Sequence, residues 1–315
     1  MAKKIQQKIS SQNQLPAELK GKRINSISDY LKDTFGTKTI KLAIDGGFTC
    51  PNRDGTKAYG GCTFCSDTGS GEFSSDIESQ IELYQRKWPK ATYLAYFQNH
   101  TNTYAPTEEL RKKYYAILKD ERIKGLVIGT RPDCLSEDVL DLLSEINETH
   151  FLWVELGLQT IHEETAKNIN RCYSLDVFNK AMSELNARGI KTVVHLILGL
   201  PGETEEMMME SVRYVSSIPD LFGIKLHLMN LVKGSTLSAT DPDYVSFPDI
   251  ETYVNLVVRC LEIIPPSVTI HRLTGDAPRP ILISPVWSFN KRTILNSINE
   301  RLNLLDTWQG KKIPG

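Results

Sequence analysis

Short strands alternate with helices along most of this chain, and that alternation restricts the folds open to it. Runs rich in β-branched and aromatic residues recur from residue 39 onward, with helical periodicity between them. The predicted strands are 39–45, 91–97, 123–129, 151–157, 190–198 and 223–229. Six strand-helix units with mostly apolar strands indicate a parallel sheet covered by helices. We therefore predict an α/β fold, a partial (β/α)6 barrel of TIM-like type.

The segments between the strands carry the start and stop signals of helices. The predicted helices are 107–119, 136–147, 174–188 and 204–217. Ser136 and Thr204 stand at N-cap positions, and Gly189 ends the third helix. After about residue 235 the rhythm changes to a loop rich in Asp and Pro, followed by a helix near 250–263, a strand near 268–274 and a helix near 289–305. We expect this part to be an α+β extension.

Three cysteines, Cys50, Cys62 and Cys65, lie in one loop-like stretch directly after the first predicted strand. Soft thiolate ligands suit iron-sulfur clusters and zinc. Three thiolates can hold three irons of a 4Fe-4S cube and leave the fourth open, whereas structural zinc normally needs four closed ligands. The remaining cysteines stand singly: Cys134, Cys172 and Cys260. The spacing therefore favours a cluster, with zinc as the alternative.

Polar residues follow most of the predicted strands, where the chemistry of parallel α/β barrels gathers. The candidates are Gln98, Asn99 and Gln159 after their strands, His195 within the fifth strand, and the Gly199 turn that follows that strand. Arg171 ends a short helical stretch, where its planar guanidinium could clamp a carboxylate. Each residue also has an ordinary structural interpretation, such as a packed core histidine, a helix-end cation or a simple βα turn. These residues lie at the same end of the predicted sheet as the cysteine loop, which favours a functional site.

The net charge of −1 excludes a globally basic nucleic-acid binder, but both ends of the chain are basic. Residues 1–23 carry six Lys and Arg against one Glu. The cationic residues near the C-terminus that we consider for RNA binding are Arg272, Arg279, Lys291 and Arg292. The alternative is a solvated tail and a solvated helix face.

Composition sets the compartment that we expect. The start of the chain has lysines without an apolar segment behind them, and no run of about 18 apolar residues occurs, so neither secretion nor a membrane span is indicated. Six cysteines in 315 residues are too sparse for a disulfide scaffold. We expect a soluble cytoplasmic protein without membrane contact.

Taken together, these features resemble the radical S-adenosylmethionine (SAM) enzymes, in which three cysteines bind a 4Fe-4S cluster. The usual spacing is C-x3-C-x2-C, and the eleven residues between Cys50 and Cys62 depart from it. The elongator catalytic subunit type shares that long gap. Further matches are Thr130-Arg131-Pro132-Asp133, Val154 to Thr160, Asn170-Arg171, Leu198 to Glu203, Lys225 and Lys233-Gly234-Ser235. The tail Pro285 to Lys291 and the stretch Tyr96 to Tyr104 resemble the YtqA/YhcC group.

The resemblance implies cofactors and contacts. It implies a 4Fe-4S cluster on the three cysteines and SAM as the second cofactor. Gln159 and Arg171 would contact the methionyl part of SAM, and His195 and the Gly199 turn would lie beside its ribose and adenine. The family's G-G-E stretch is absent, and Gln98-Asn99 would serve the same surface. Gly129 stands where related enzymes often have an acidic residue, so that contact is not carried over.

The resemblance also implies a function. The Gram-positive branch of the YtqA/YhcC group is linked to wobble-uridine modification of tRNA. We therefore expect conversion of 5-carboxymethylaminomethyl-uridine, with or without 2-thiolation, to 5-aminomethyl-uridine. Partners would be the tRNA anticodon region and an electron donor such as flavodoxin or ferredoxin. We expect a basic segment over 1–24, a radical SAM core over 25–240 and an RNA-binding extension over 241–315. No catalytic side chain is assigned. Rival interpretations are a radical SAM enzyme for a small molecule or protein, and a zinc or redox-sensing RNA-binding scaffold.

Overall fold

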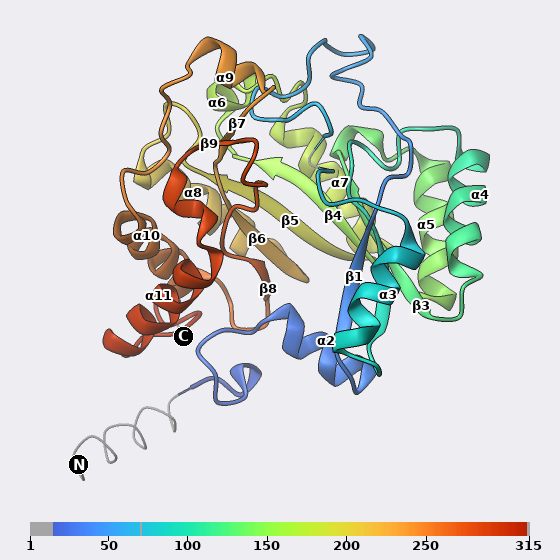
Figure 1. Cartoon of the computed structure of the whole chain (residues 1–315), viewed down its shortest axis with the longest axis horizontal. Coiled ribbons are helices and arrows are strands. Elements are labelled where there is room, and N and C mark those ends of the chain that lie inside the picture. Colours follow the sequence, from blue (N-terminus) through green and yellow to red (C-terminus); the bar gives the residue numbers. More distant parts are fainter. Residues whose placement is uncertain (1–14, 70, 314–315) are drawn as a thin grey trace.

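Seven parallel strands lie side by side in one curved sheet in the computed structural model, which describes residues 15–69 and 71–313 (Figure 1). Within these residues the sheet order is β1-β2-β3-β4-β5-β6-β8. The strands are β1 (Thr39–Ile44), β2 (Thr92–Phe97), β3 (Ile123–Thr130), β4 (Phe151–Gln159), β5 (Lys191–Leu198), β6 (Gly223–Leu228) and β8 (Thr269–Arg272). The predicted α/β partial barrel is confirmed, with one strand more than the six expected.

Helices connect the strands and cover the outer face of the sheet (Figure 1). They are α2 (Ile27–Phe35), α3 (Ile77–Lys87), α4 (Thr107–Leu118), α5 (Glu137–Thr149), α6 (Glu163–Asn168), α7 (Leu175–Ala187), α8 (Glu205–Ser216), α9 (Thr236–Thr240), α10 (Ile250–Ile263) and α11 (Lys291–Leu304). The four helices predicted between strands lie within two residues of their expected bounds. Thr204 caps α8 by accepting from Met207 N at 3.3 Å, whereas the Ser136 side chain makes no capping bond.

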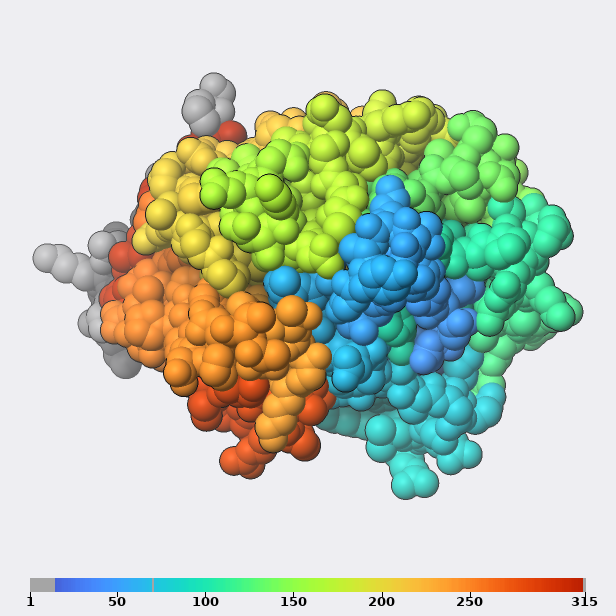
Figure 2. All heavy atoms as spheres, turned by 90° about the horizontal axis from the view of Figure 1, so that it is seen from above, coloured from blue at the N-terminus to red at the C-terminus, as the bar shows by residue number. Residues whose placement is uncertain are grey.

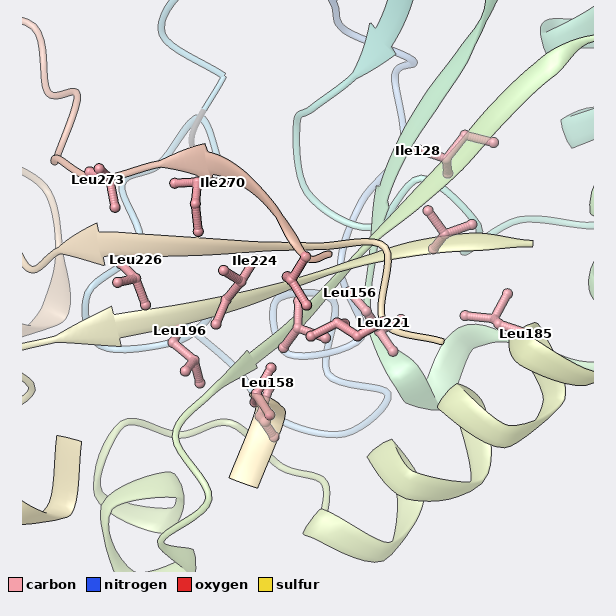
Figure 3. Packing of buried hydrophobic residues seen from close by; sticks show 14 of the residues in the cluster. Ile128, Leu156, Leu158, Leu185, Leu196, Leu221, Ile224, Leu226, Ile270 and Leu273 are labelled. Atoms are coloured by element: carbon pink, nitrogen blue, oxygen red, sulfur yellow. The ribbon is translucent and has the colours of Figure 1, made fainter. Parts of the chain in front are cut away.

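The outer faces of the strands carry the main hydrophobic core. Alternate strand residues such as Leu156, Leu196 and Leu226 are fully buried, and Figure 3 shows them on the same side of the strands as Leu158 and Ile224. Alternation follows from the pleat, which turns every second side chain to the same face. The other half of each strand therefore faces the barrel interior, where the functional groups are found.

An apolar layer closes the lower end of the barrel interior. Trp153 and Val193 are fully buried there and pack with Leu31 of α2. The ring of Tyr30, also on α2, meets Phe222 edge-on at 5.0 Å between centroids. α2 lies at the lower end of the sheet in Figure 1. The cavity of the barrel lies above this layer, toward the carboxyl ends of the strands.

The C-terminal extension adds one strand, β8, to the same sheet. β8 pairs in parallel with β6, and the short strands β7 (Leu231–Val232) and β9 (Leu282–Ser284) form a separate antiparallel pair. Arg23 donates to Thr307 O at 2.9 Å, which ties the N-terminal segment to the C-terminal one. Residues 1–14 of the predicted basic segment lie outside the described residues. Short 3-10 turns complete the chain at Ala17–Leu19, Pro132–Cys134 and Val286–Phe289. No helix in the described ranges combines the length and apolarity needed to cross a bilayer.

Candidate functional site

A cavity opens at the carboxyl ends of the strands, and Cys50, Cys62 and Cys65 all line it. Viewed from above, the cysteine loop lies between the segment near residue 165 and the segment near residue 240 (Figure 2). Hydrogen bonds join these segments. Thr63 N donates to Ile169 O at 3.0 Å, and Leu237 N donates to Thr63 O at 2.8 Å. The loop is therefore anchored on both sides at the mouth of the barrel.

The three thiols are reduced and differ in their surroundings. None of the six cysteines forms a disulfide. Cys65 N donates to Cys62 O at 2.9 Å, and the Asn52 amide lies 3.7 Å from Cys62 Sγ. Burial, followed by the neighbouring Cys65 and Cys50, raises the pKa of the Cys62 thiol far above its ordinary value. Within the described residues, no group of three His, Cys, Asp or Glu side chains forms a ready-made cage for a single ion.

The residues around the cysteines suit a bound polar group. Thr101 Oγ1, His100 Nδ1 and Asn230 Oδ1 are buried without a hydrogen-bond partner in the described part of the chain. All three residues line the cavity. A buried polar atom without a partner costs free energy that a ligand recovers on binding. Three soft thiol donors and these orphaned polar atoms together fit a thiolate-held cluster with a polar ligand beside it.

Gln159 stands at the end of β4 in a strained conformation. Its φ is +66°, and the β4–β5 register shifts between Gly157 and Gln159. The bulge turns the Gln159 side chain into the cavity, where the Tyr173 hydroxyl lies 3.0 Å from its Oε1. Tyr173 stacks between two guanidinium groups, Arg131 at 4.9 Å and Arg171 at 4.7 Å from its ring centroid.

Glu155 is the centre of a polar layer inside the barrel, directly above the apolar layer around Trp153. Its carboxylate is fully buried and ion-paired with Lys225. Lys41 Nζ lies 3.3 Å and Trp153 Nε1 lies 3.1 Å from Oε1, and His195 Nε2 lies 3.1 Å from Oε2. Burial alone would raise the pKa of Glu155, but Lys225 and Lys41 hold it well below its usual range.

His195 faces the cavity in this layer, as the sequence predicts for a site residue. Burial, and next the Lys225 charge, lower its pKa to about 4, although Glu155 opposes the shift. The imidazole is therefore neutral near pH 7. One ring nitrogen is 3.1 Å from Glu155, so the other is available to a ligand in the cavity.

Arg171 lies behind the cavity wall. It is not part of the cavity lining, and its side chain is 1% exposed. The guanidinium donates to Leu158 O at 3.0 Å, to Thr160 O at 2.6 Å and to Tyr173 O at 3.0 Å. Three backbone carbonyls take three of its five N–H groups, and its Nη2 lies 3.5 Å from the Glu163 carboxylate. In this structure Arg171 is a support behind the β4 turn, and Arg131 is the arginine of this group that reaches the cavity.

Asn99 and Gly199 also lie outside the lining, unlike Gln98, which is part of it. Asn99 is 3% exposed and donates to Ser74 Oγ at 3.2 Å. Gly199 has φ +85°, and a Cβ added there would meet Phe247 at 2.7 Å and Ser246 at 2.8 Å. Residues from the C-terminal segment therefore cover the Gly199 turn, on which the sequence predicted an adenine ring.

The four predicted RNA-binding residues separate in the structure. Arg272 lines the cavity and lies 3.4 Å from Asp276. Lys291 shares that carboxylate at 2.8 Å. Arg279 stacks 4.7 Å from the Phe289 ring centroid, and Arg292 is exposed at the start of α11. Three of the four are thus at the surface, and one points into the site.

The fold and the cysteine-lined cavity define the class of protein, and comparison with known families agrees. Residues 50–215 match the radical SAM superfamily, and residues 221–303 match the radical SAM C-terminal domain. The chain therefore belongs to the radical SAM superfamily, which implies a 4Fe-4S cluster and SAM.

Within this superfamily the chain is a member of the YtqA/YhcC group. It is 44% identical to the uncharacterized protein YtqA of Bacillus subtilis over 308 residues, which is 95% of each chain. It is 36% identical to the protein YhcC of Escherichia coli, over 90% of this chain and 93% of that one. Both relatives match nearly the whole chain. The group therefore shares the C-terminal extension as well as the barrel.

More distant similarity leads to the elongator proteins. The chain is 28% identical to Elongator complex protein 3 of Saccharomyces cerevisiae over 174 residues, which cover 54% of this chain and 30% of that protein. The solved structure of archaeal Elp3 from Methanocaldococcus infernus has a TM-score of 0.63 at 18% identity, covering 86% of this chain and 64% of that one. At that identity the likeness shows a shared fold.

Proposed function

We propose that this chain is a radical SAM enzyme that converts 5-carboxymethylaminomethyl-uridine, or its 2-thiolated form, at the tRNA wobble position into 5-aminomethyl-uridine. The observation that carries the proposal is a single cavity. The three cysteine thiols line its rim, and the polar layer around Glu155, with the cations Lys225 and Arg272, lines its interior. The sequence resemblance to the YtqA/YhcC group supplies the tRNA link. When bound, the cluster and SAM supply a 5′-deoxyadenosyl radical that removes one hydrogen atom from the substrate.

The chain's own residues account for binding and shielding. Cys50, Cys62 and Cys65 would hold the cluster, and Gln159 and His195 would contact SAM from the ends of neighbouring strands. The apolar layer around Trp153 closes the barrel below them. A closed, water-poor interior protects a reactive intermediate from side reactions.

The proposed conversion balances in atoms and electrons. The glycine-like methylene of the substrate loses a hydrogen atom, the resulting carbon radical returns one electron to the oxidised electron donor, and the adjacent nitrogen releases its proton, which leaves an imine. Water hydrolyses the imine to the aminomethyl base and a two-carbon aldehyde acid. One electron enters from a donor such as flavodoxin or ferredoxin to start the reaction, and one electron leaves the substrate radical. No described side chain is assigned to the electron transfer.

Nucleoside analysis of tRNA tests the proposal. Deletion of the gene is expected to raise 5-carboxymethylaminomethyl-uridine and its 2-thiolated form, and to remove the corresponding aminomethyl nucleosides. Re-expression of the parent chain should restore them, whereas a Cys50→Ala chain should not. An unchanged nucleoside profile in the deletion strain would assign the enzyme to a small-molecule or protein substrate. Iron and sulfide content after anaerobic reconstitution distinguishes a cluster from zinc.

A further inference from the structure

Two carboxylates in or beside the cavity are each shared by two cationic side chains. Lys41 and Lys225 share the carboxylate of Glu155. Arg272 and Lys291 share that of Asp276. Four cationic side chains thus meet two carboxylates, and the inner members are buried, since the Lys225 and Glu155 side chains are 3% and 0% exposed. Excess charge at low dielectric is costly unless an anion compensates it.

Lys225 and Arg272 are the two cations of this group that line the cavity. They are register partners on the adjacent strands β6 and β8, so their backbones lie side by side. The Lys225 ammonium donates to Glu155 and to Tyr96 OH at 3.3 Å, which leaves one of its three N–H groups. Arg272 makes one long contact, 3.4 Å to Asp276, from a group with five N–H donors.

The electrostatics agree with this geometry. Burial, and then the charges of Lys41 and Arg272, hold the pKa of Lys225 well below its ordinary value, although Glu155 opposes the shift. The cations therefore disfavour one another in the unliganded protein. An anion between Lys225 and Arg272 would relieve that repulsion. A carboxylate matches the planar fork of an arginine and accepts from both residues.

We propose that Lys225 and Arg272 form a subsite for the carboxylate of the substrate's glycine-like arm. This inference rests on the proposed function, because that substrate carries its carboxylate one bond from the carbon that would lose hydrogen. The two residues stand on the last two strands of the sheet, whereas the cysteine loop follows the first. Anchoring the carboxylate would place the adjacent methylene above the polar layer around Glu155. Arg272 thereby takes a role inside the cavity that differs from phosphate binding at the surface.

N-methylglycine is a probe that copies the end of this arm without the RNA. Its binding to the full chain, reconstituted anaerobically with its cluster, is measured by saturation-transfer NMR beside its methyl ester, which lacks the carboxylate charge. The parent should bind the acid and not the ester, in the presence of saturating SAM as well as without it. Arg272→Gln should weaken binding by at least about tenfold, as expected for loss of a charge-assisted hydrogen bond. Arg86→Gln, which removes an exposed charge of the same type far from the proposed RNA-binding cations, should bind as the parent does.

Removing Lys225 alone would leave the buried Glu155 carboxylate with one lysine partner fewer. The role of Lys225 is therefore tested in a variant that removes both charges. The double variant Glu155→Gln/Lys225→Met should also lose binding of the acid by at least about tenfold. Iron content and a cooperative thermal transition identify preparations that are folded. Equal binding of acid and ester, parent-like binding by folded Arg272→Gln, or no binding by the parent overturns the subsite. Displacement of the probe by SAM also overturns it, because the site would then belong to the cofactor.

Binding and conversion of RNA are tested separately. Failure of the carboxylate subsite can then be distinguished from failure of the wobble-uridine assignment. Anticodon stem-loop RNA with the carboxylated base is compared with the same RNA carrying the methyl ester of that base. The parent should prefer the acid, and Arg272→Gln should lose the preference. If the probe binds as described while neither RNA is converted, the carboxylate subsite stands and the wobble-uridine assignment fails.

Discussion

The Tyr173 hydroxyl lies 3.0 Å from Oε1 of Gln159 and also donates to the carbonyl of Gly157. Tyr173 therefore fixes the end of β4, where Gln159 is held at positive φ, and it fixes which face of the amide looks into the cavity. The single hydroxyl proton is shared between two acceptors, Gly157 O and Gln159 Oε1, so a polar contact as well as packing orients the Gln159 amide.

Changes at this pair are expected to affect SAM binding without affecting the cluster. Gln159→Ala should weaken SAM affinity by about tenfold, and Tyr173→Phe by about threefold, because each loses a hydrogen bond at the cavity wall. Calorimetric titration of the anaerobic protein measures the affinity, and iron content is the control. Parent-like affinity in both variants would remove Gln159 from the cofactor site.

Arg171→Ala is expected to lower stability more than it lowers cofactor affinity. The buried guanidinium satisfies the carbonyls of Leu158, Thr160 and Tyr173, and its removal leaves them without that donor. The expected loss is about 3 kcal/mol in the free energy of unfolding. Urea unfolding of the parent and of Arg171→Ala measures it. A variant with parent stability and much weaker SAM binding would instead support the cofactor contact predicted from the sequence.

Single replacement of Cys50, Cys62 or Cys65 by Ala should remove most of the iron and abolish cleavage of SAM, since a cube missing one of its three thiolates is poorly held. Cys172→Ala is the matched control, because Cys172 is exposed and adjoins Arg171 outside the cavity lining. Cys134→Ala and Cys260→Ala should also retain iron. The assignment is wrong if any of these three controls loses its iron while Cys50→Ala keeps it.

Acid should destabilise the protein partly through His195. Its folded pKa of about 4 lies below the unfolded value near 6.5, so between these values the unfolded chain binds the extra proton. The stability that the neutral imidazole contributes is full above about pH 6.5 and is lost as the pH falls toward 4. Near pH 5.5 the expected slope from this residue is about 1 kcal/mol per pH unit. Unfolding free energies of parent and His195→Gln at several pH values measure it, and identical slopes would contradict the buried neutral state.

The surface cations near the C-terminus should contribute to RNA affinity. Neutralising Arg279, Lys291 and Arg292 to Gln removes three charges close to the mouth-lining segment 276–281. Each lost phosphate contact should reduce the slope of log affinity against log salt by about 0.7 to 0.9. The measurement is tRNA binding at two salt concentrations. Affinity and slope equal to the parent would exclude a role for this surface in binding the tRNA phosphates. Adding Arg272→Gln should lower affinity further only for RNA with the carboxylated base.

The barrel was predictable because its strands are long apolar runs and its helices carry ordinary caps. The positions of Gln159 and His195 in the cavity follow from the same reasoning, since the carboxyl ends of parallel strands meet at one face. β8 was predicted as a strand but not as a member of the sheet. Its four residues contain no signal for the partner they pair with.

Other parts of the site depend on contacts between distant segments. Glu155 and Lys225 are far apart in the sequence, and their pairing depends on the register of three strands. Inward alternation along β4 would have suggested Glu155, because a charged residue in an apolar strand needs a partner. The direction of the Arg171 guanidinium and the cover over Gly199 had no such signal, since both depend on contacts with other segments of the chain.

The apolar layer beneath Glu155 has a kinetic consequence. Trp153, Val193 and Leu31 close the lower end of the barrel, so molecules enter and leave past the cysteine loop. A macromolecule seated on that mouth would retain methionine and 5′-deoxyadenosine behind it. If tRNA is the substrate, as we propose, SAM would enter before the RNA, and the RNA would depart before the spent cofactor. Under saturating RNA, turnover would be paced by the departure of the modified tRNA, and the first turnover would be faster than those that follow.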